Sequence, residues 1–496
     1  MDHNVDVVVV GGGPAGMTVA GDLARLGCSV AVVEKWLTVN PSSRAFATMA
    51  RTLELLDARG LADQLLATST TTPGINLFKG AKLDLTHLRS RYRFAMITPQ
   101  TNVDQALERY AREQGADIHR GMALVDLIQD ATGVTLTARP KDDDNPSSTM
   151  TWRAAYAVGA DGAHSTVRGL VGMDFPGKSV LSSVVLADVK LTAGPQGGGL
   201  TLGDTPREFG FLAPYGKEDS DGSWYRSMTW DRERQVPDTD PVGEAEIVGS
   251  LNRAMGRDVG VVDVGWHSRF HCDERQVRDY RSGRVFLVGD AAHVHSPMGA
   301  QGMNTGIQDG ANLAWKLGAV LAGADDSILD TYHRERYPIG KRVVRQSGLM
   351  MRAVTLHPRP ARFLRDLLAP HILSIPRVRD VVAGSFAGTE LRYPSSDGQS
   401  DLVGTRATEV PLHEGRLTEL QRRPGFVFIR ENGTASTMQN PGTDLLVHAR
   451  RTDDGPALLV RPDGYIAWAG SSTSRGGEEG WPAALSRWTG ARQSSL

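Results

Sequence analysis

The sequence contains only two cysteines, Cys28 and Cys272, among 496 residues. Two cysteines are too few for a disulfide framework or for a zinc site with four cysteine ligands. Such scarcity is typical of proteins that work in a reducing compartment. We therefore expect a cytoplasmic protein whose fold depends on a packed core and not on disulfide cross-links.

An excess of charge of either sign is also missing, because 55 Lys and Arg balance 57 Asp and Glu to a formal net charge of −2. No strong electrostatic field therefore attracts nucleic acid or an anionic membrane. No apolar run approaches the roughly 20 residues that span a bilayer. The start Met1-Asp2-His3-Asn4 lacks the basic residues of a signal peptide. We expect neither a nucleic-acid partner nor a membrane partner.

The opening of the chain has the order of a dinucleotide-binding unit. A β-branched run over 5–10 leads into Gly11-x-Gly13-x-x-Gly16, a helical segment over 17–26, a strand over 29–33 and then Glu34. The first glycine allows a tight turn, the second lets backbone approach a pyrophosphate, and the third lets helix and strand pack closely. The helix N-terminus offers free N–H groups to the phosphates. Glu34 is placed to accept hydrogen bonds from ribose hydroxyls.

Two further motifs follow predicted strands. Asp161-Gly162 comes after a strand-like segment over 154–158, and Gly289-Asp290 comes after another over 285–288. The second is followed by a glycine-rich stretch, 297–304, that enters a helix over 305–321. Backbone N–H groups at that helix N-terminus suit the electron-rich edge of a reduced flavin. A simple turn after a core strand would explain one of these motifs, but not all three at this spacing.

Together the three motifs resemble those of the group A flavoprotein monooxygenases, the p-hydroxybenzoate hydroxylase superfamily, and within it the aromatic-polyketide hydroxylases and rifampicin monooxygenases. The resemblance covers nearly the whole chain, including Tyr332-His333-x-Glu335-Arg336. The segment 459–468 matches the C-terminal thioredoxin-like domain of these proteins. That domain lacks a Cys-x-x-Cys pair here, which excludes thiol redox work by it.

The resemblance implies an α/β fold: a Rossmann-type FAD-binding domain with an inserted β-sheet substrate domain and a C-terminal thioredoxin-like domain. The FAD-binding domain is expected in two parts, 1–177 and 275–392. In the first part, the residue pattern predicts a helix over 98–115, introduced by Pro99. The alternating, strand-like pattern over 178–274 marks the middle β-sheet domain between them. The thioredoxin-like domain is expected over 401–496, after a polar linker. Within this part the residue pattern predicts strands over 426–430 and 458–461.

The resemblance also implies how the cofactor FAD is held. Glu34 and Lys35 would flank the adenosine ribose, with Leu124 near the adenine. Arg44 and Gln100 would contact the phosphate and ribityl region, Asp290 the ribityl–pyrophosphate side, and Met303 and Asn304 the isoalloxazine edge. The full predicted set is Gly11, Gly13, Pro14, Ala15, Gly16, Glu34, Lys35, Arg44, Gln100, Leu124, Asp161, Asp290, Pro297, Gly302, Met303 and Asn304.

The activity implied is an FAD-dependent monooxygenase, in which NAD(P)H reduces FAD and a C4a-hydroperoxyflavin hydroxylates a phenolic, polyketide-type substrate. A second glycine fingerprint is missing, so NAD(P)H is expected as a transient co-substrate, with a preference for NADPH. Partners are an aromatic small molecule and molecular oxygen, and the chain is a monomer or a homodimer. Baeyer–Villiger oxidation, inactivation of an aromatic antibiotic and a flavoprotein reductase remain alternatives.

No catalytic side chain and no metal ligand is predicted. His293 and His295 flank the flavin loop, but histidines in such positions are more often structural. Substrate contacts are expected from the middle sheet, with the aromatic side chains of Trp224, Tyr225, Trp230 and Trp266 as candidates.

Overall fold

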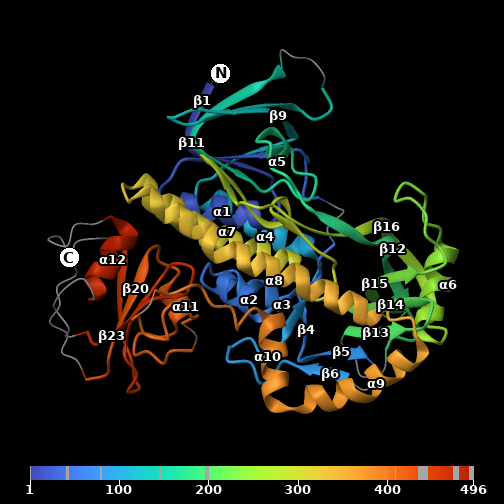
Figure 1. Ribbon diagram of the computed structural model, residues 1–496. Coiled ribbons are helices and arrows are strands. Elements are labelled where there is room, and N and C mark those ends of the chain that lie inside the picture. Colours follow the sequence, from blue (N-terminus) through green and yellow to red (C-terminus); the bar gives the residue numbers. More distant parts are fainter. Residues whose placement is uncertain are drawn as a thin grey trace.

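The structure is a computed structural model, and it describes residues 2–40, 44–78, 81–143, 148–195, 200–219, 221–396, 398–407, 409–433, 445–472 and 480–490. Figure 1 shows three large sheets around two long helices, α7 (Gly302–Leu321) and α8 (Asp330–Val354). In the view of Figure 1, the first sheet lies at the top with the N-terminus, the C-terminal sheet at the lower left and the second sheet at the right, and α8 runs diagonally across the centre. The fold is therefore mixed α/β, as predicted.

The first sheet is mainly parallel, with the N-terminal strand near its centre. Its main path runs β17-β18-β11-β1-β2-β8, and the strands β1 (Asp2–Val10), β2 (Val30–Glu34), β8 (Asp117–Arg120), β11 (Met150–Gly159) and β18 (Val285–Leu287) pair in parallel. The short β17 (Arg281–Ser282) pairs with β18 in the antiparallel direction. Val7, Val8 and Val9 are fully buried because elements cover both faces, the usual reason for a continuous apolar run. Helices α1 (Pro14–Arg25) and α4 (Gln100–Glu113) follow the predicted positions within three residues.

The second sheet is built mainly from antiparallel strands between residues 177 and 276. Its order is β19-β16-β12-β15-β14-β13-β5-β6, in which β19 is His293–Val294. The long strands are β12 (Gly177–Leu191), β14 (Glu208–Asp219), β15 (Gly222–Asp231) and β16 (Val261–Gln276), and the shorter β13 (Leu200–Asp204) completes this part. The alternating pattern of 178–274 did not reveal that β5 (Gly74–Phe78) and β6 (Ala81–Asp84) extend the same sheet. They join through a parallel pairing of Leu200 with Ile75, a contact between segments far apart in sequence.

The C-terminal part forms a four-stranded sheet of its own, in the order β21-β20-β22-β23. Strand β20 (Phe426–Arg430) has the predicted bounds, and β22 (Ala457–Val460) is shifted by one residue from the prediction. The strands β21 (Leu446–Arg450) and β23 (Ile466–Gly470) and the helix α12 (Trp481–Thr489) complete it. The ring of Trp481 on α12 stacks on Phe428 with centroids 4.1 Å apart, which fixes the helix against the sheet.

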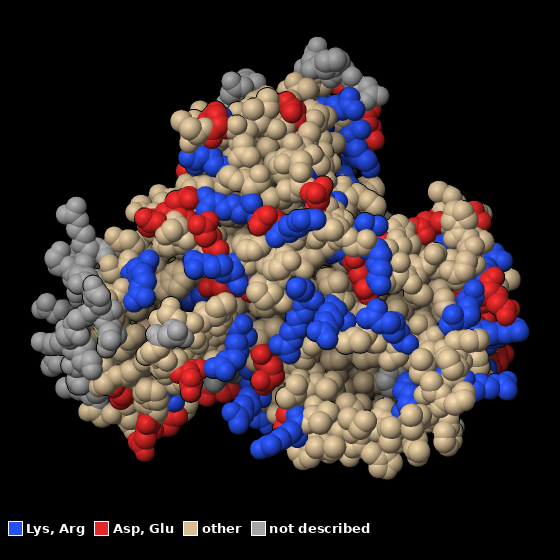
Figure 2. Space-filling model, in the orientation of Figure 1, with Lys and Arg blue, Asp and Glu red and all other residues tan. Residues whose placement is uncertain are grey.

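The visible face of the protein carries charges of both signs. In Figure 2, Lys and Arg are interspersed with Asp and Glu over the upper part of this face, Lys and Arg gather across its centre, and its lower right part is mostly uncharged. The helix α9 (Arg359–Ser374), at the bottom of the view in Figure 1, buries none of its residues fully and exposes Phe363, Leu367 and Ile372. No helix in the described ranges is long and apolar enough to cross a membrane.

Candidate active site

The turn after β1 has the geometry that the glycine pattern predicted. Gly11 has φ +110°, and a Cβ there would lie 2.3 Å from the carbonyl oxygen of Ala160. A Cβ at Gly16 would lie 2.0 Å from the carbonyl oxygen of Gly11, so close packing requires glycine. A Cβ at Gly13 would meet no atom within 4 Å. The space in front of Gly13 is therefore open, as an approaching pyrophosphate requires.

The start of α1 packs against α7 close to the N-terminus of that helix. Pro14 opens α1, and a Cβ at Gly306, the fifth residue of α7, would lie 3.4 Å from the Cβ of Ala15. A Cβ at Gly310 would come within 2.8 Å of the Ala15 carbonyl oxygen, and one at Gly289 within 3.3 Å of the Ala15 Cβ. Small residues thus bring two helix N-termini together, and each contributes a positive dipole end to one region.

The residues predicted for the adenosine end lie near the edge of the first sheet. The Glu34 carboxylate accepts hydrogen bonds from the N–H groups of Gly12 and Trp36, the latter at 2.8 Å. Lys35 next to it is exposed. Leu124 is half-buried on β9 (Met122–Gln129), beside an irregularity in its pairing with β10 (Val134–Pro140). Glu34 is already held by the glycine turn, and contact of these residues with a ribose or adenine stays a prediction.

Arg44 offers a cation without a hydrogen bond to any described residue. Its guanidinium lies 4.4 Å from the centre of the Phe270 ring. The Arg44 side chain is exposed to solvent, and the charge of Asp290 lies close enough to interact with it. Gln100 fixes the neighbouring backbone, because its side-chain oxygen accepts from the Ala45 N–H at 3.0 Å. An exposed guanidinium that makes no hydrogen bond to a described residue is available to a phosphate.

The Asp161-Gly162 motif helps to hold the turn that follows Gly289-Asp290. The Asp161 carboxylate accepts hydrogen bonds from the Ser165 hydroxyl at 2.5 Å and from the Thr166 N–H at 2.7 Å, which opens the short helix α5 (Thr166–Leu170). Arg168 on α5 then donates to the carbonyl oxygen of Ala291 at 2.9 Å. Because its carboxylate is used inside the protein, we expect Asp161 to act on the cofactor site through position and not through a side-chain contact.

Asp290 and His295 face the N-terminus of α7 together. A Cβ at Gly302 would lie 3.8 Å from Oδ1 of Asp290 and 3.7 Å from Nε2 of His295. The Asp290 side chain is open to solvent. No described residue donates a hydrogen bond to it. An open carboxylate at this position is able to accept hydrogen bonds from ribityl hydroxyls.

His295 is held in one tautomer. Its Nδ1 lies 2.8 Å from the carbonyl oxygen of Ser296, which only accepts, so Nδ1 carries the proton and Nε2 is a bare acceptor. Nε2 is buried and has no hydrogen-bond partner in the described structure. Burial lowers the pKa of His295 to about 4. The imidazole is therefore neutral near pH 7 and presents an acceptor beside Asp290.

Asn304 joins α7 to the wall of the neighbouring cavity. Its amide donates to the carbonyl oxygens of Ala47 (3.0 Å) and Ala300 (2.6 Å) and accepts from the Met49 N–H at 2.9 Å. The side chain is thus fully engaged within the protein. Any contact of Asn304 with a flavin edge falls to its main chain, and half-buried Met303 precedes it in the same turn.

An apolar cavity of about 50 Å³ lies against the loop that leads into α7. Thr72 is the single hydroxyl residue among those that line it, and its Oγ1 donates to the Gly74 carbonyl oxygen at 2.7 Å. The lining residues are Phe46, Ala47, Met49, Thr72, Ile75, Leu77, Ala95, Ile97, Leu200, Leu202, Phe211, Pro297, Met298, Gly299, Ala300, Met350 and Phe386. Walls of this composition suit an apolar group.

The aromatic residues that the sequence suggested for substrate contact do not line this cavity. Tyr225 packs on the opposite face of the second sheet, in the cluster around α6 (Glu244–Met255). Trp230 packs near Phe209 with ring centroids 6.1 Å apart, and Trp266 lies under the guanidinium of Arg226. Strand spacing alone did not show which side chains reach the cavity. Its walls come from short segments, such as 46–49 and 95–97, that carry no motif.

The donor set fits FAD. Two helix N-termini, an open space at Gly13 and the cation of Arg44 suit the pyrophosphate, and the Asp290 carboxylate suits the ribityl chain. The apolar cavity adjoins the predicted isoalloxazine edge through Pro297. No group of three His, Cys, Asp or Glu side chains in the described ranges is placed to hold a metal ion.

Gly13→Ala tests the open space directly. A Cβ at Gly13 meets no protein atom, so we expect the melting temperature of the FAD-free protein to stay unchanged. The Cβ would occupy the room that the pyrophosphate needs, and we expect about tenfold weaker FAD binding, roughly 1.4 kcal/mol, by fluorescence titration. Gly169→Ala is the matched control, since its Cβ also meets nothing. Equal FAD affinity in both variants would contradict this assignment.

His295 makes a second prediction, on stability against pH. A free imidazole has a pKa of about 6.5, and burial lowers the pKa of His295 to about 4. Between these values the unfolded chain binds more protons, so the free energy of unfolding decreases as the pH falls from 6.5 to 4. We expect His295→Leu to flatten this slope in urea unfolding, while His267→Leu, at an exposed position, leaves it unchanged. If the wild-type protein and both variants show the same slope of unfolding free energy against pH, the lowered pKa of His295 is refuted.

Comparison with known proteins gives the same picture. Residues 4–347 match the family described as FAD binding domain, and residues 400–491 match the family described as aromatic-ring hydroxylase, C-terminal. A 12-dehydrotetracycline 5-monooxygenase/anhydrotetracycline 6-monooxygenase of Streptomyces rimosus is 35% identical over 98% of this chain and 99% of its own. A rifampicin monooxygenase of Streptomyces venezuelae is 34% identical over 94% of this chain and 95% of its own.

A solved structure agrees as well. The anhydrotetracycline hydroxylase OxyS from Streptomyces rimosus superposes with a TM-score of 0.83 at 34% identity, over 98% of this chain and 99% of that chain. These matches cover both the cofactor-binding part and the C-terminal part. The chain therefore belongs to the FAD-dependent aromatic hydroxylases, the group A flavoprotein monooxygenases that its three motifs resemble.

Proposed function

We propose that this protein is an FAD-dependent monooxygenase that uses NAD(P)H and molecular oxygen to hydroxylate a phenolic, polyketide-type aromatic substrate. The single observation that supports the substrate class best is the apolar wall beside the loop 297–300. Its cavity of about 50 Å³ is smaller than the roughly 150 Å³ that holds one benzene ring, so a fused-ring substrate requires this wall to widen. The relatives that act on tetracyclines and rifampicin support the same substrate class. The NAD(P)H is a transient co-substrate in this proposal, with a preference for NADPH.

The residues of the chain bind FAD, orient the substrate ring and shield the reacting atoms from water. Bound FAD supplies the redox chemistry and the activation of oxygen. The helix N-termini at Pro14 and Gly302, with Arg44, hold the phosphates and place the flavin edge. The walls around Phe46, Met298 and Phe386 keep water away from the reacting atoms and orient the ring. Within the described cavity wall no ionisable side chain adjoins the substrate.

The domain division is part of the proposal. The FAD-binding domain comprises 1–177 and 275–392, the substrate domain 178–274 with β5 and β6 added, and the thioredoxin-like domain 401–496. Parallel pairing of β20 with β21 and antiparallel pairing of β22 with β20 and β23 support the thioredoxin-like assignment, because that fold has the same strand order and directions.

Isotopically labelled O₂ tests the activity. With NADPH and a polycyclic phenol such as anhydrotetracycline, we expect one labelled oxygen atom per product molecule and one NADPH consumed, by mass spectrometry and absorbance. Label in a new hydroxyl group beside the phenol identifies hydroxylation, and label inserted into a carbon–carbon bond identifies a Baeyer–Villiger reaction. A reduced or rearranged product that carries no label, from a screen of such phenols, would overturn the monooxygenase assignment.

A further inference from the structure

The turn after β22 carries two charges that are buried against α7 and α8. The Asp463 carboxylate accepts a hydrogen bond from the Asn312 amide on α7 at 2.9 Å. Arg461 donates to both carboxylate oxygens of Glu335 on α8 at 2.8 Å each, and it also pairs with Asp463. All four side chains are buried. The C-terminal part therefore meets the two long helices through polar groups that water does not reach.

Lys316 extends this contact along α7. Its ammonium donates to Glu335 at 2.7 Å and to the side-chain oxygen of Asn312 at 2.9 Å. Burial lowers the pKa of Lys316 to about 8. Burial alone would raise the pKa of Glu335, but Arg461 and Lys316 outweigh it and lower that pKa. Buried charges of this kind are held by their partners, so movement of one partner disturbs the others.

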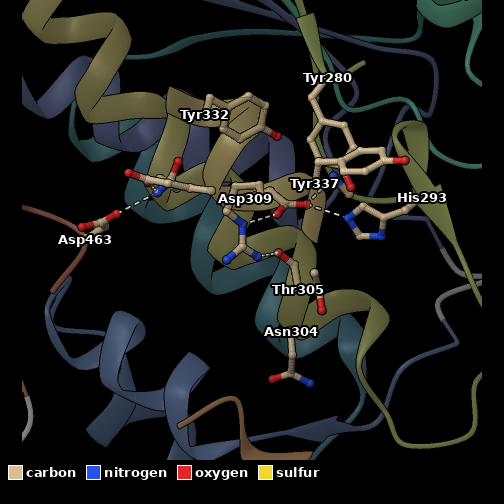
Figure 3. Close-up of polar contacts among 12 residues, drawn as sticks. Tyr280, His293, Asn304, Thr305, Asp309, Tyr332, Tyr337 and Asp463 are labelled. Carbon is tan, nitrogen blue, oxygen red and sulfur yellow. Dashed lines mark hydrogen bonds and ion pairs between the residues drawn. The ribbon is translucent and has the colours of Figure 1, made fainter. Parts of the chain in front are cut away.

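The same face of α7 carries Asp309, three residues before Asn312, and this residue reaches the cofactor loop. Its carboxylate accepts hydrogen bonds from the Gly289 N–H at 3.2 Å and from His293 Nε2 at 2.8 Å. The third donor is Arg336 on α8, at 2.6 Å. Figure 3 shows His293 and Asp309 pointing toward each other, and Asp463 on the far side of α7 and α8. Gly289 and His293 bracket Asp290, so Asp309 fixes the turn that presents Asp290.

A second set of contacts also connects the C-terminal part with the start of α7. Arg336 donates to the Thr305 carbonyl oxygen at 3.3 Å, in the first turn of α7, and to the Tyr393 hydroxyl at 3.2 Å. The ring of Tyr393 stacks on Tyr465 in the C-terminal part, with centroids 4.0 Å apart. Arg336 and Glu335 are adjacent in α8, so both paths pass through one turn of that helix.

We propose that the C-terminal part positions the FAD-binding loop through this buried relay, which runs from Asp463 and Arg461 through Asn312, Lys316 and Glu335 to Asp309 and Arg336. A thioredoxin-like unit without a Cys-x-x-Cys pair thereby contributes to cofactor binding although it carries none of the predicted cofactor contacts. Asp463 and Asp309 are positioning residues. The inference concerns FAD binding and does not depend on which substrate is oxidised.

Asp463→Asn tests the relay in the full-length protein, because it removes the charge and keeps the shape. Couplings of this kind are typically worth 0.5–2 kcal/mol, so we expect the FAD dissociation constant to rise by about 2- to 30-fold. The reduction potential of bound FAD should shift with it, since the Asp290 turn moves. The matched control is Thr418→Val, which removes the 2.8 Å hydrogen bond of Thr418 to Asp57 on α2 (Ala50–Asp57). That bond also joins the C-terminal part to the rest, but it does not touch α7.

The melting temperature of the FAD-free protein separates a positioning role from a merely structural one. We expect both variants to lower it, and only Asp463→Asn to change the FAD affinity and the reduction potential. Should Asp463→Asn fail to fold, Asn312→Ala breaks the same link and leaves Asp463 paired with Arg461. In a double-mutant cycle that combines Asp463→Asn with Asp309→Asn, the loss of FAD affinity in the double variant should be smaller than the sum of the two single losses. FAD affinity and potential unchanged in Asp463→Asn or Asn312→Ala would overturn the proposal.

Discussion

The structure depends on one buried carboxylate, Asp309, which meets a backbone N–H, an imidazole and a guanidinium from three separate elements. Burial would raise the pKa of Asp309, but Arg336 and His293 outweigh it, so the pKa is lowered and the group stays ionised. Loss of one partner of a buried charge such as this is strongly destabilising, because the charge is then left without compensation. The cofactor turn, α7 and α8 are therefore placed relative to one another by the need to satisfy a single side chain.

The cofactor site follows from that placement. With α7 fixed, the small residues at Ala15 and Gly310 let the start of α1 pack closely against α7. The positive ends of both helices then face one region, which accounts for the binding of a dinucleotide by backbone groups with few charged side chains. Arg44 adds a cation that makes no hydrogen bond to a described residue, and Asp290 adds the open carboxylate.

The sequence predicted the features that local chemistry dictates. The strand, glycine turn and helix at 5–26 and the strand 426–430 lie where their patterns placed them, because glycine geometry and apolar periodicity are local constraints. The cavity wall was not predictable, since 46–49, 95–97 and Phe386 meet only through long-range packing. The roles of Asp161 and Asn304 were also hidden. Motif membership suggested cofactor contacts, whereas the structure uses both side chains to hold neighbouring backbone.

The central claim is that one FAD is held at both ends, with its adenosine half at the α1 turn and its flavin half at the α7 turn. Calorimetric titration of the cofactor-free protein with FAD and, separately, with FMN tests it most directly, because FMN lacks the adenosine half. The account predicts one FAD per chain and FMN binding that is weaker by about tenfold or more. Equal affinity for FAD and FMN would show that the glycine turn at Gly11 to Gly16 holds no part of the cofactor, and would contradict the account.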